Sequence, residues 1–146
     1  MLTKSRLNHS IGVARKCYIL AKELNKPEDF CRKMFFLGYI HDIGYEFGTN
    51  ENHADICVDI LQSLGVLDEV GSIKYHSKYP CIHTLEWKIL SIADLTVDSE
   101  GNYVDVNVRL QDIKHRYGEH SNQYLTACDV AYMVGLTNYN LAGNIT

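Results

Sequence analysis

The sequence of 146 residues contains few helix breakers and no long apolar run. Only two prolines occur, Pro27 and Pro80, and this scarcity favours a mostly helical chain because proline disrupts helix interiors. No uninterrupted apolar stretch approaches the roughly 18 residues that a membrane helix needs. The N-terminus leads directly into polar residues and shows no signal-peptide pattern. We therefore expect a cytoplasmic protein that has no membrane partner.

The sequence also lacks a basic surface and a framework of paired cysteines. Fourteen Lys and Arg residues stand against 18 Asp and Glu residues, so the formal net charge is −4, which argues against a duplex nucleic acid as partner. The five cysteines are widely spaced and form no CxxC motif, which predicts reduced thiols and neither disulfides nor a zinc ribbon. Glycine-rich phosphate loops, a GxSxG elbow and a Cys–His nucleophile pattern are absent as well.

The composition that remains is that of a folded globular domain. Hydrophobic residues make up 46% of the chain and charged residues 22%, and no internal repeat or linker interrupts the sequence. The length fits one domain. We therefore expect a single domain over residues 1–146.

Apolar residues recur at helical spacing along the first half of the chain. One stripe runs through Leu7, Ile11, Ala14, Tyr18 and Ala21. Residues 25–29 form a helix start, with the capping function on Asn25 or Lys26 and Pro27 in the first turn. The helix that follows carries Phe30, Met34, Leu37 and His41 on one stripe, and we place Phe30, Phe35 and Phe36 in the core. A helix from His53 to Leu64 and a shorter one from Asp68 to about Ser77 complete this half.

The second half predicts three more helices. Residues 85–97 are apolar on nearly all sides, which indicates a central buried helix. The segment Val104–Leu110 alternates like a strand, but the helical pattern continues as far as Tyr117, so we expect a helix that ends at Gly118. A last helix spans about Ser121 to Val134. The predicted fold is an all-α, single-domain bundle of six to seven helices.

Several His and Asp residues occupy inward or helix-end positions in this scheme. Asp94 lies in the middle of the most apolar helix, where an ionised carboxylate costs several kcal/mol unless it is paired or bound to a cation. Imidazole and carboxylate ligands together suit Fe, Mn, Co, Ni or Zn. We therefore predict a metal site drawn from His9, His41, Asp42, His53, His76 and Asp94. The alternative is a helical domain without metal, whose histidines are simply buried. The remaining histidines, His83, His115 and His120, lie in polar surroundings and are expected to face solvent.

The order of these pieces resembles the HD domain of the metal-dependent phosphohydrolase superfamily, in particular its small bacterial members. The matching pieces are Arg6-Leu7-Asn8-His9-Ser10, Leu37 to Tyr45 around His41-Asp42, His53-Ala54-Asp55, Tyr75-His76-Ser77 and Ile92 to Thr96 around Asp94. Further on, Val108 to Ile113 and Arg116-Tyr117-Gly118 resemble the end of the small members. The resemblance implies an all-α bundle.

The resemblance also implies a ligand set. His9, His41, Asp42 and Asp94 would hold a first divalent metal ion, with Mg possible beside the transition metals. His53 and His76 would hold a second ion, in which case Asp42 would bridge the two. Two such ions lower the pKa of a shared water toward about 7, and the hydroxide can attack a phosphorus atom. Asp42 would orient that hydroxide as a catalytic residue.

Substrate binding is the part of the pattern where this chain departs from its relatives. Many relatives carry Lys directly after the His-Asp-x-Gly run, but Tyr45 stands there in this sequence. Lys78 is therefore our candidate for the catalytic phosphate contact, with Lys74 or Arg6 able to take the same role.

The sequence thus predicts a metal-dependent phosphohydrolase that acts on a nucleotide or related small phosphate ester. One alternative is a catalytically weak regulatory module that binds metal and nucleotide, and Tyr45 is the feature that motivates it. Another is a dinucleoside polyphosphate hydrolase. The sequence shows no zipper or large apolar stripe that would indicate an oligomer.

Overall fold

The computed structural model describes residues 3–42 and 84–138. This part of the chain is all-helical, as expected, and its single β contact is an isolated bridge between Val97 and Tyr103. The helices are α1 (Lys4–Glu23), α2 (Glu28–Ile40), α5 (Leu85–Leu95), α6 (Val106–Tyr117) and α7 (Asn122–Met133). Five of the expected helices are therefore observed. The two expected helices over residues 53–77 lie outside the described residues.

Most of these helices begin at a side-chain cap that the sequence supplies. Thr3, Thr84 and Ser121 each accept a hydrogen bond from the backbone N–H three residues later, and Asp105 accepts one from the residue two positions later. Such a bond satisfies one of the first N–H groups of a helix, which have no partner within the helix. Gly118 follows the end of α6, as predicted. The helical interpretation of residues 106–117 was correct, and the strand alternative was not.

The start of α2 differs from the prediction. Pro27 itself occupies the N-cap position, and no side chain caps the helix, so neither Asn25 nor Lys26 has the expected role. Asn25 instead has a φ of 57°, the left-handed conformation in which a chain commonly leaves a helix, and here it follows α1. Glu28 and Asp29 in the first turn of α2 provide negative charge beside the positive end of the helix dipole.

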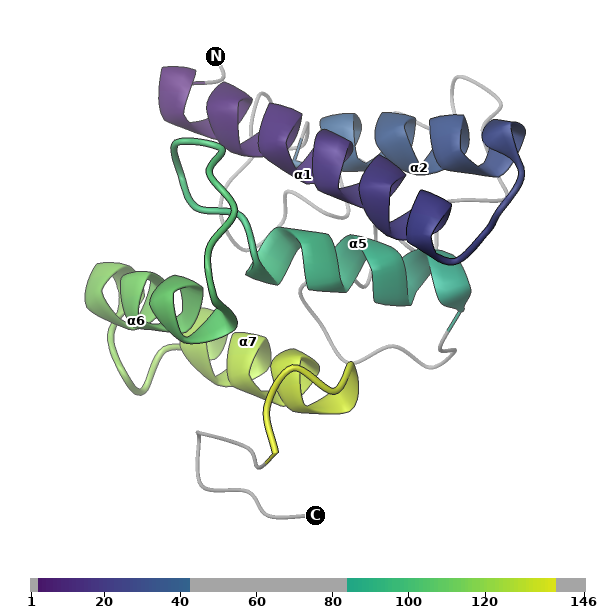
Figure 1. Cartoon of the computed structure of the whole chain (residues 1–146). Coiled ribbons are helices and arrows are strands. Elements are labelled where there is room, and N and C mark those ends of the chain that lie inside the picture. The colour runs from purple at the N-terminus through teal and green to yellow at the C-terminus, as the bar shows by residue number, and fades with distance from the viewer. Residues whose placement is uncertain (1–2, 43–83, 139–146) are drawn as a thin grey trace, which may run out of the picture.

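Helix α5 lies at the centre of the described structure. It contacts α1 and α2 on one side and α6 and α7 on the other, and Figure 1 shows α1 and α2 side by side above it with α6 and α7 below. Because α1 and α2 are joined by a short connection, they run antiparallel. The prediction of a central helix over residues 85–97 is confirmed, although the helix itself ends at Leu95.

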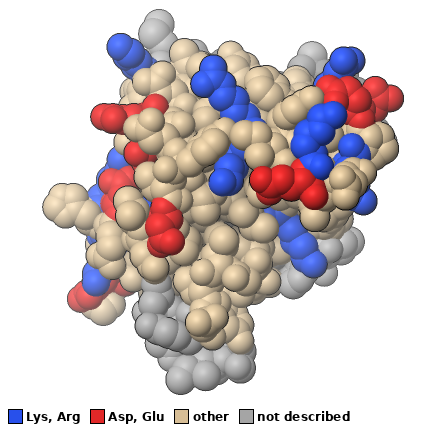
Figure 2. Space-filling view, viewed as in Figure 1, with Lys and Arg blue, Asp and Glu red and all other residues tan. Residues whose placement is uncertain are grey.

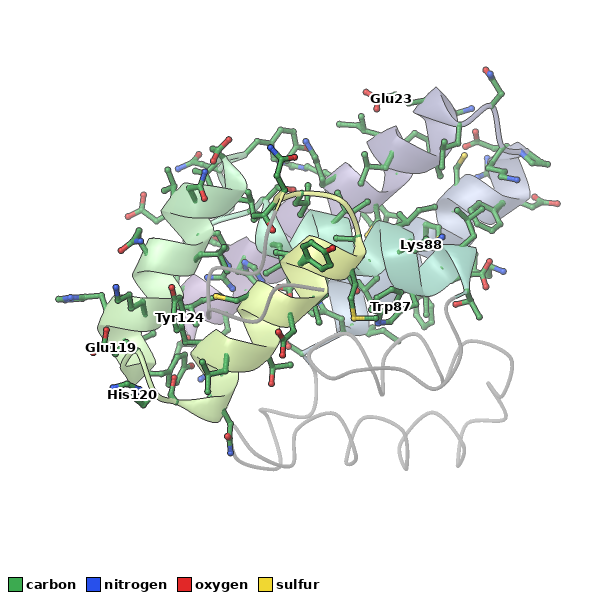
Figure 3. All side chains as sticks on the ribbon, turned by 90° about the horizontal axis from the view of Figure 1, so that it is seen from below. Glu23, Trp87, Lys88, Glu119, His120 and Tyr124 are labelled. Atoms are coloured by element: carbon green, nitrogen blue, oxygen red, sulfur yellow. The ribbon has the colours of Figure 1, made fainter. Side chains whose placement is uncertain are left out.

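Two apolar clusters hold these layers together, and α5 contributes to both. The first cluster joins α1, α2 and α5 and includes Val13, Met34, Leu37 and Leu90, all fully buried. The second joins α5 to α6 and α7 and includes Trp87, Leu110, Tyr124 and Cys128 (Figure 3, with Trp87 and Tyr124 labelled). The opposite faces of one helix therefore support two separate cores.

The buried face of α1 agrees only in part with the predicted stripe. Ala14 and Ala21 of that stripe are fully buried, but Leu7 is 38% exposed, and the other buried positions include His9, Val13 and Cys17. The reason is close packing through small residues, because a Cβ atom on Gly38 of α2 would lie only 2.8 Å from the Cα atom of Ala14. The two helices therefore approach along the side of α1 that has little side-chain bulk.

The prediction that three phenylalanines are core residues was wrong for two of them. Phe35 is 40% exposed and Phe36 is 46% exposed, while Phe30 packs against the first cluster. The buried positions of α2 are Cys31, Met34, Leu37, Gly38 and Ile40. Phe35 and Phe36 fall on the other side of the helix, so their aromatic character does not decide their burial.

The surface carries charges of both signs. On the face shown in Figure 2, Lys and Arg are interspersed with Asp and Glu, and neither sign covers a continuous area. None of the described helices is both long and apolar enough to cross a membrane.

Candidate metal centre

The ends of three helices bring the predicted site residues together. His9 lies in the second turn of α1, His41 and Asp42 follow directly after α2, and Asp94 lies in the last turn of α5. Asp94 is therefore near the end of its helix, whereas the apolar pattern had placed it in the middle. His41 is fully buried, and only 6% of the His9 side chain is exposed.

Three close contacts connect these four side chains. The Nε2 atom of His9 is 2.8 Å from Oδ1 of Asp94. The Nε2 atom of His41 is 3.2 Å from Oδ2 of Asp42 and 3.5 Å from Oδ1 of Asp94. His9, His41 and Asp42 each offer a ligand atom, and these atoms all lie within 4.8 Å of one another. The structure thus contains a possible His/Asp metal site.

Backbone carbonyl groups fix which nitrogen of each histidine faces this centre. The Nδ1 atom of His9 donates to the carbonyl oxygen of Asp98 at 3.0 Å, and that of His41 donates to Gly38 at 2.7 Å. A carbonyl oxygen only accepts, so Nδ1 carries the proton in both rings. In the neutral rings, Nε2 then has a lone pair directed at carboxylate oxygens. Two acceptors in contact need a proton or a metal ion between them.

The spacing of these atoms fits a shared ion. Ligands bonded about 2.1 Å from one ion lie about 3.0 Å apart at a right angle and about 3.4 Å apart at the tetrahedral angle. The observed separations of 2.8, 3.2 and 3.5 Å fall around these values. Imidazole nitrogen with carboxylate oxygen is also a donor set that divalent transition metals accept. The residues present therefore fit a divalent metal ion.

Electrostatics at the centre favour positive charge. Burial opposes a charge on His41, but the carboxylates of Asp42 and Asp94 outweigh burial and raise its pKa well above the ordinary 6.5. Burial likewise opposes ionisation of Asp94, but hydrogen bonds from His41 and His9 hold its pKa well below the ordinary 3.8. The metal-free centre thus holds a cationic imidazole against ionised carboxylates, and a metal ion would displace that proton.

A short loop after α5 positions His9. The carboxylate of Asp98 accepts hydrogen bonds from the backbone N–H groups of Glu100 and Asn102, and its carbonyl oxygen accepts from Gly101 as well as from His9. Gly101 has a φ of 87°, and a Cβ atom there would lie 2.5 Å from the carbonyl oxygen of Asn8. Only glycine allows this loop to approach α1 closely enough for the bond to His9.

Arg109 on α6 contacts the centre and was missed by sequence reasoning. Its Nε atom donates to the carbonyl oxygen of Asp94 at 3.3 Å, and Nη2 lies 3.8 Å from Oδ1 of the same residue. It also pairs with Asp112 at 3.4 Å. Its side chain is only 14% exposed. The only signal in the sequence was its position between the two buried residues of α6, three residues after Val106 and one before Leu110.

The remaining predicted site residues have different outcomes. His53, His76, Lys74, Lys78 and Tyr45 lie outside the described residues, so a second metal site and the lysine contact stay predictions. Arg6 lines the same cleft as His9 and Asp42. The expectation that two other histidines face solvent is confirmed: His115 is exposed, and His120 is 93% exposed at the outer end of the α6–α7 turn (Figure 3).

The three cysteines of the described segments are free thiols, and all three are buried. Cys17, Cys31 and Cys128 form no disulfide. Burial raises the pKa of the Cys17 thiol far above its ordinary value, which keeps it protonated and unreactive. The possible metal site accordingly contains no thiolate ligand from these residues.

A comparison with known protein families matches residues 6–97 to the HD domain. The chain belongs to the HD-domain family. Proteins of this family are usually hydrolases, and HD domains bind divalent metals. No curated protein and no solved structure matches the chain. The matched HD segment contains all four clustered residues, His9, His41, Asp42 and Asp94, whereas α6 and α7 lie beyond it.

Proposed function

We propose that this HD-domain protein is a metal-dependent phosphohydrolase that acts on a nucleotide or a related small phosphate ester. The observation that carries the proposal is the convergence of the two Nε2 atoms, of His9 and His41, on the carboxylates of Asp42 and Asp94. Backbone carbonyls at both Nδ1 atoms prepare these nitrogens for a cation. A histidine that merely fills a core also needs hydrogen-bond partners, but two imidazole nitrogens that face two carboxylates form a donor set for a divalent ion.

The four clustered residues and Arg109 would have distinct roles in hydrolysis. His9, His41, Asp42 and Asp94 would hold the ion, and the ion would supply an activated water and neutralise charge on phosphoryl oxygens. Asp42 is 12% exposed and lines the cleft, so its carboxylate would orient the attacking water. Arg109 contacts the backbone carbonyl and the carboxylate of Asp94, and these contacts would keep the carboxylate ionised and correctly oriented.

The cleft admits the substrate from the side of α1 and α6. His9 and Asp42 line it together with Arg6 and Arg109. Guanidinium groups hold phosphoryl oxygens through charge-assisted hydrogen bonds, so these arginines would bind the oxygens that do not react. Lys78, predicted from the sequence for the same contact, would add a further cation.

The test is hydrolysis of a panel of phosphate esters by the purified protein after it has been loaded with Mn or Fe. Asp42→Ala should lower turnover by at least about 100-fold, because it removes a group that acts on the ion and on the water. Asp29→Ala, an exposed carboxylate in the first turn of α2, is the matched control and should retain full activity.

Three results would contradict the proposal. Equal activity of Asp42→Ala and the unmodified protein would show that hydrolysis does not use this centre. Absence of transition metal after reconstitution, measured by elemental analysis, would leave a helical domain with buried histidines. Nucleotide binding without product formation would favour the regulatory module instead.

A further inference from the structure

A cleft of about 70 Å³ opens beside the candidate metal centre and continues away from it along α6. His9 and Asp42 line its inner end. The rest of the cleft is lined by Arg6 from α1 and by two arginines from α6, Arg109 and Arg116. These two residues lie two turns apart on one face of α6. Three arginines thus lie at one opening, although the protein as a whole has a net charge of −4.

The two arginines of α6 are held side by side by a single carboxylate. Oδ2 of Asp112 lies 3.4 Å from Nη1 of Arg109 and 3.2 Å from Nη2 of Arg116. Asp112 is shared by both guanidinium groups, and Arg109 also lies 3.8 Å from Oδ1 of Asp94. Each guanidinium group has five N–H donors, and a single carboxylate occupies few of them. The pair is therefore suited to an additional oxyanion.

The charges of the whole site indicate which anion this is. The described part of the site contains three arginines, Arg6, Arg109 and Arg116, and three aspartates, Asp42, Asp94 and Asp112, so the charges of these six side chains sum to zero. One divalent ion at the metal centre then leaves two positive charges. A terminal phosphoryl group is a dianion near neutral pH and neutralises them, whereas the phosphate of a diester carries a single negative charge.

We propose that Arg109 and Arg116, together with Arg6, form a phosphate subsite that holds a terminal phosphoryl group against the metal centre. This inference rests on the proposed function and narrows its substrate class to compounds with a terminal phosphate, such as phosphomonoesters. Helix α6 lies beyond residues 6–97, the segment that matches the HD domain. The α6 part of the subsite is therefore supplied by a segment outside the family match.

The test uses inorganic phosphate as the probe and the full chain as the protein. Phosphate is titrated by calorimetry into the metal-free protein and into the Mn-loaded protein. Arg116→Gln removes one charge from a side chain that is 47% exposed, so the variant should fold normally. Arg32→Gln on α2, with a side chain that is 73% exposed and pairs with Glu28 outside the cleft, is the matched control.

We expect Arg116→Gln to weaken phosphate binding about tenfold, the loss that corresponds to one hydrogen bond to a charged group. Arg32→Gln should bind phosphate as the unmodified protein does, and Arg116→Lys should recover part of the affinity because it restores the charge but not the fork geometry. Bound Mn should be unchanged in all three variants. Phenyl phosphate should displace phosphate, and diphenyl phosphate should not.

The subsite proposal is overturned if Arg116→Gln and the unmodified protein bind phosphate with the same affinity. It is also overturned if phenyl phosphate and diphenyl phosphate compete equally well with phosphate. Failure of the proposed function looks different. In that case Mn does not bind, but the metal-free protein still binds phosphate and loses affinity on Arg116→Gln. The two failures are therefore distinguished by the metal content and by the metal-free titration.

Discussion

Replacement of Gly101 by Ala should damage the metal centre from a distance. A Cβ atom at this position would lie 2.5 Å from the carbonyl oxygen of Asn8, whereas an ordinary contact begins at 3.4 Å. The loop must therefore move away from α1 by about 0.9 Å, the difference between these two distances. The bond from His9 to the carbonyl oxygen of Asp98 is 3.0 Å long, and a displacement of that size would stretch it beyond hydrogen-bonding range.

The expected magnitudes follow from these contacts. A left-handed conformation costs a residue with a Cβ atom about 1–2 kcal/mol. The lost hydrogen bond adds about 1 kcal/mol. We expect Gly101→Ala to lower the free energy of unfolding by about 3 kcal/mol once the steric contact is included. Metal affinity should fall by at least about tenfold, because the orientation of the His9 ring depends on this bond.

Gly135→Ala is the matched control. Gly135 has a φ of 81°, close to the 87° of Gly101, but a Cβ atom there would meet nothing within 4 Å. This variant should lose only the conformational cost of about 1–2 kcal/mol and should bind metal normally. Urea unfolding and calorimetric titration with Mn measure the two quantities. If both variants lose the same stability and bind Mn equally well, the argument from close approach is refuted.

Two further predictions concern the metal-free protein and the number of ions. The pKa of His41 is raised, so its positive charge stabilises the metal-free fold fully below about pH 6.5, and this stabilisation is lost as the pH rises through the raised pKa. Urea unfolding in the presence of a chelator should show this decline in the free energy of unfolding. The Mn-loaded protein should not show the decline, because His41 carries no such proton there. A pH-independent stability of the metal-free protein over that range would contradict the assignment. His53→Ala should lower the metal content from about two ions per chain toward one, as measured by elemental analysis, if His53 helps to hold a second ion. An unchanged content would give His53 a role in substrate binding or structure.

The predictable part of this fold is the part governed by local rules. The limits of α5, α6 and α7 were predicted to within two residues, and Gly118 was predicted to end α6. These limits coincide with short-range features, namely the caps Thr84 and Ser121 and the terminating Gly118. The buried side of α1 was predicted only in part, at Ala14 and Ala21, because it depends on which neighbouring helix approaches. Gly38 and Ala14 allow that approach, and Leu7 is left partly exposed as a result.

The candidate site shows the same division. His9, His41, Asp42 and Asp94 were selected because His and Asp at inward helix positions are costly without partners, and the structure brings them together. Arg109 was missed because its partner Asp94 lies 15 residues earlier in the chain, on another helix. Arginine on an amphipathic helix is ordinarily a surface residue, and only tertiary packing of α6 against α5 gives it another role.

The double-sided packing of α5 determines what the smallest stable unit of this protein is. A fragment cut after residue 97 would retain the whole segment that defines the family, but it would expose Trp87 and Leu95, which α6 and α7 cover in the intact chain. The same helix holds Asp94 in its last turn. Loss of the C-terminal helices would therefore weaken the packing that supports the metal centre. A domain boundary drawn from family similarity alone would be too short for expression of the domain or for transfer of the site to another protein.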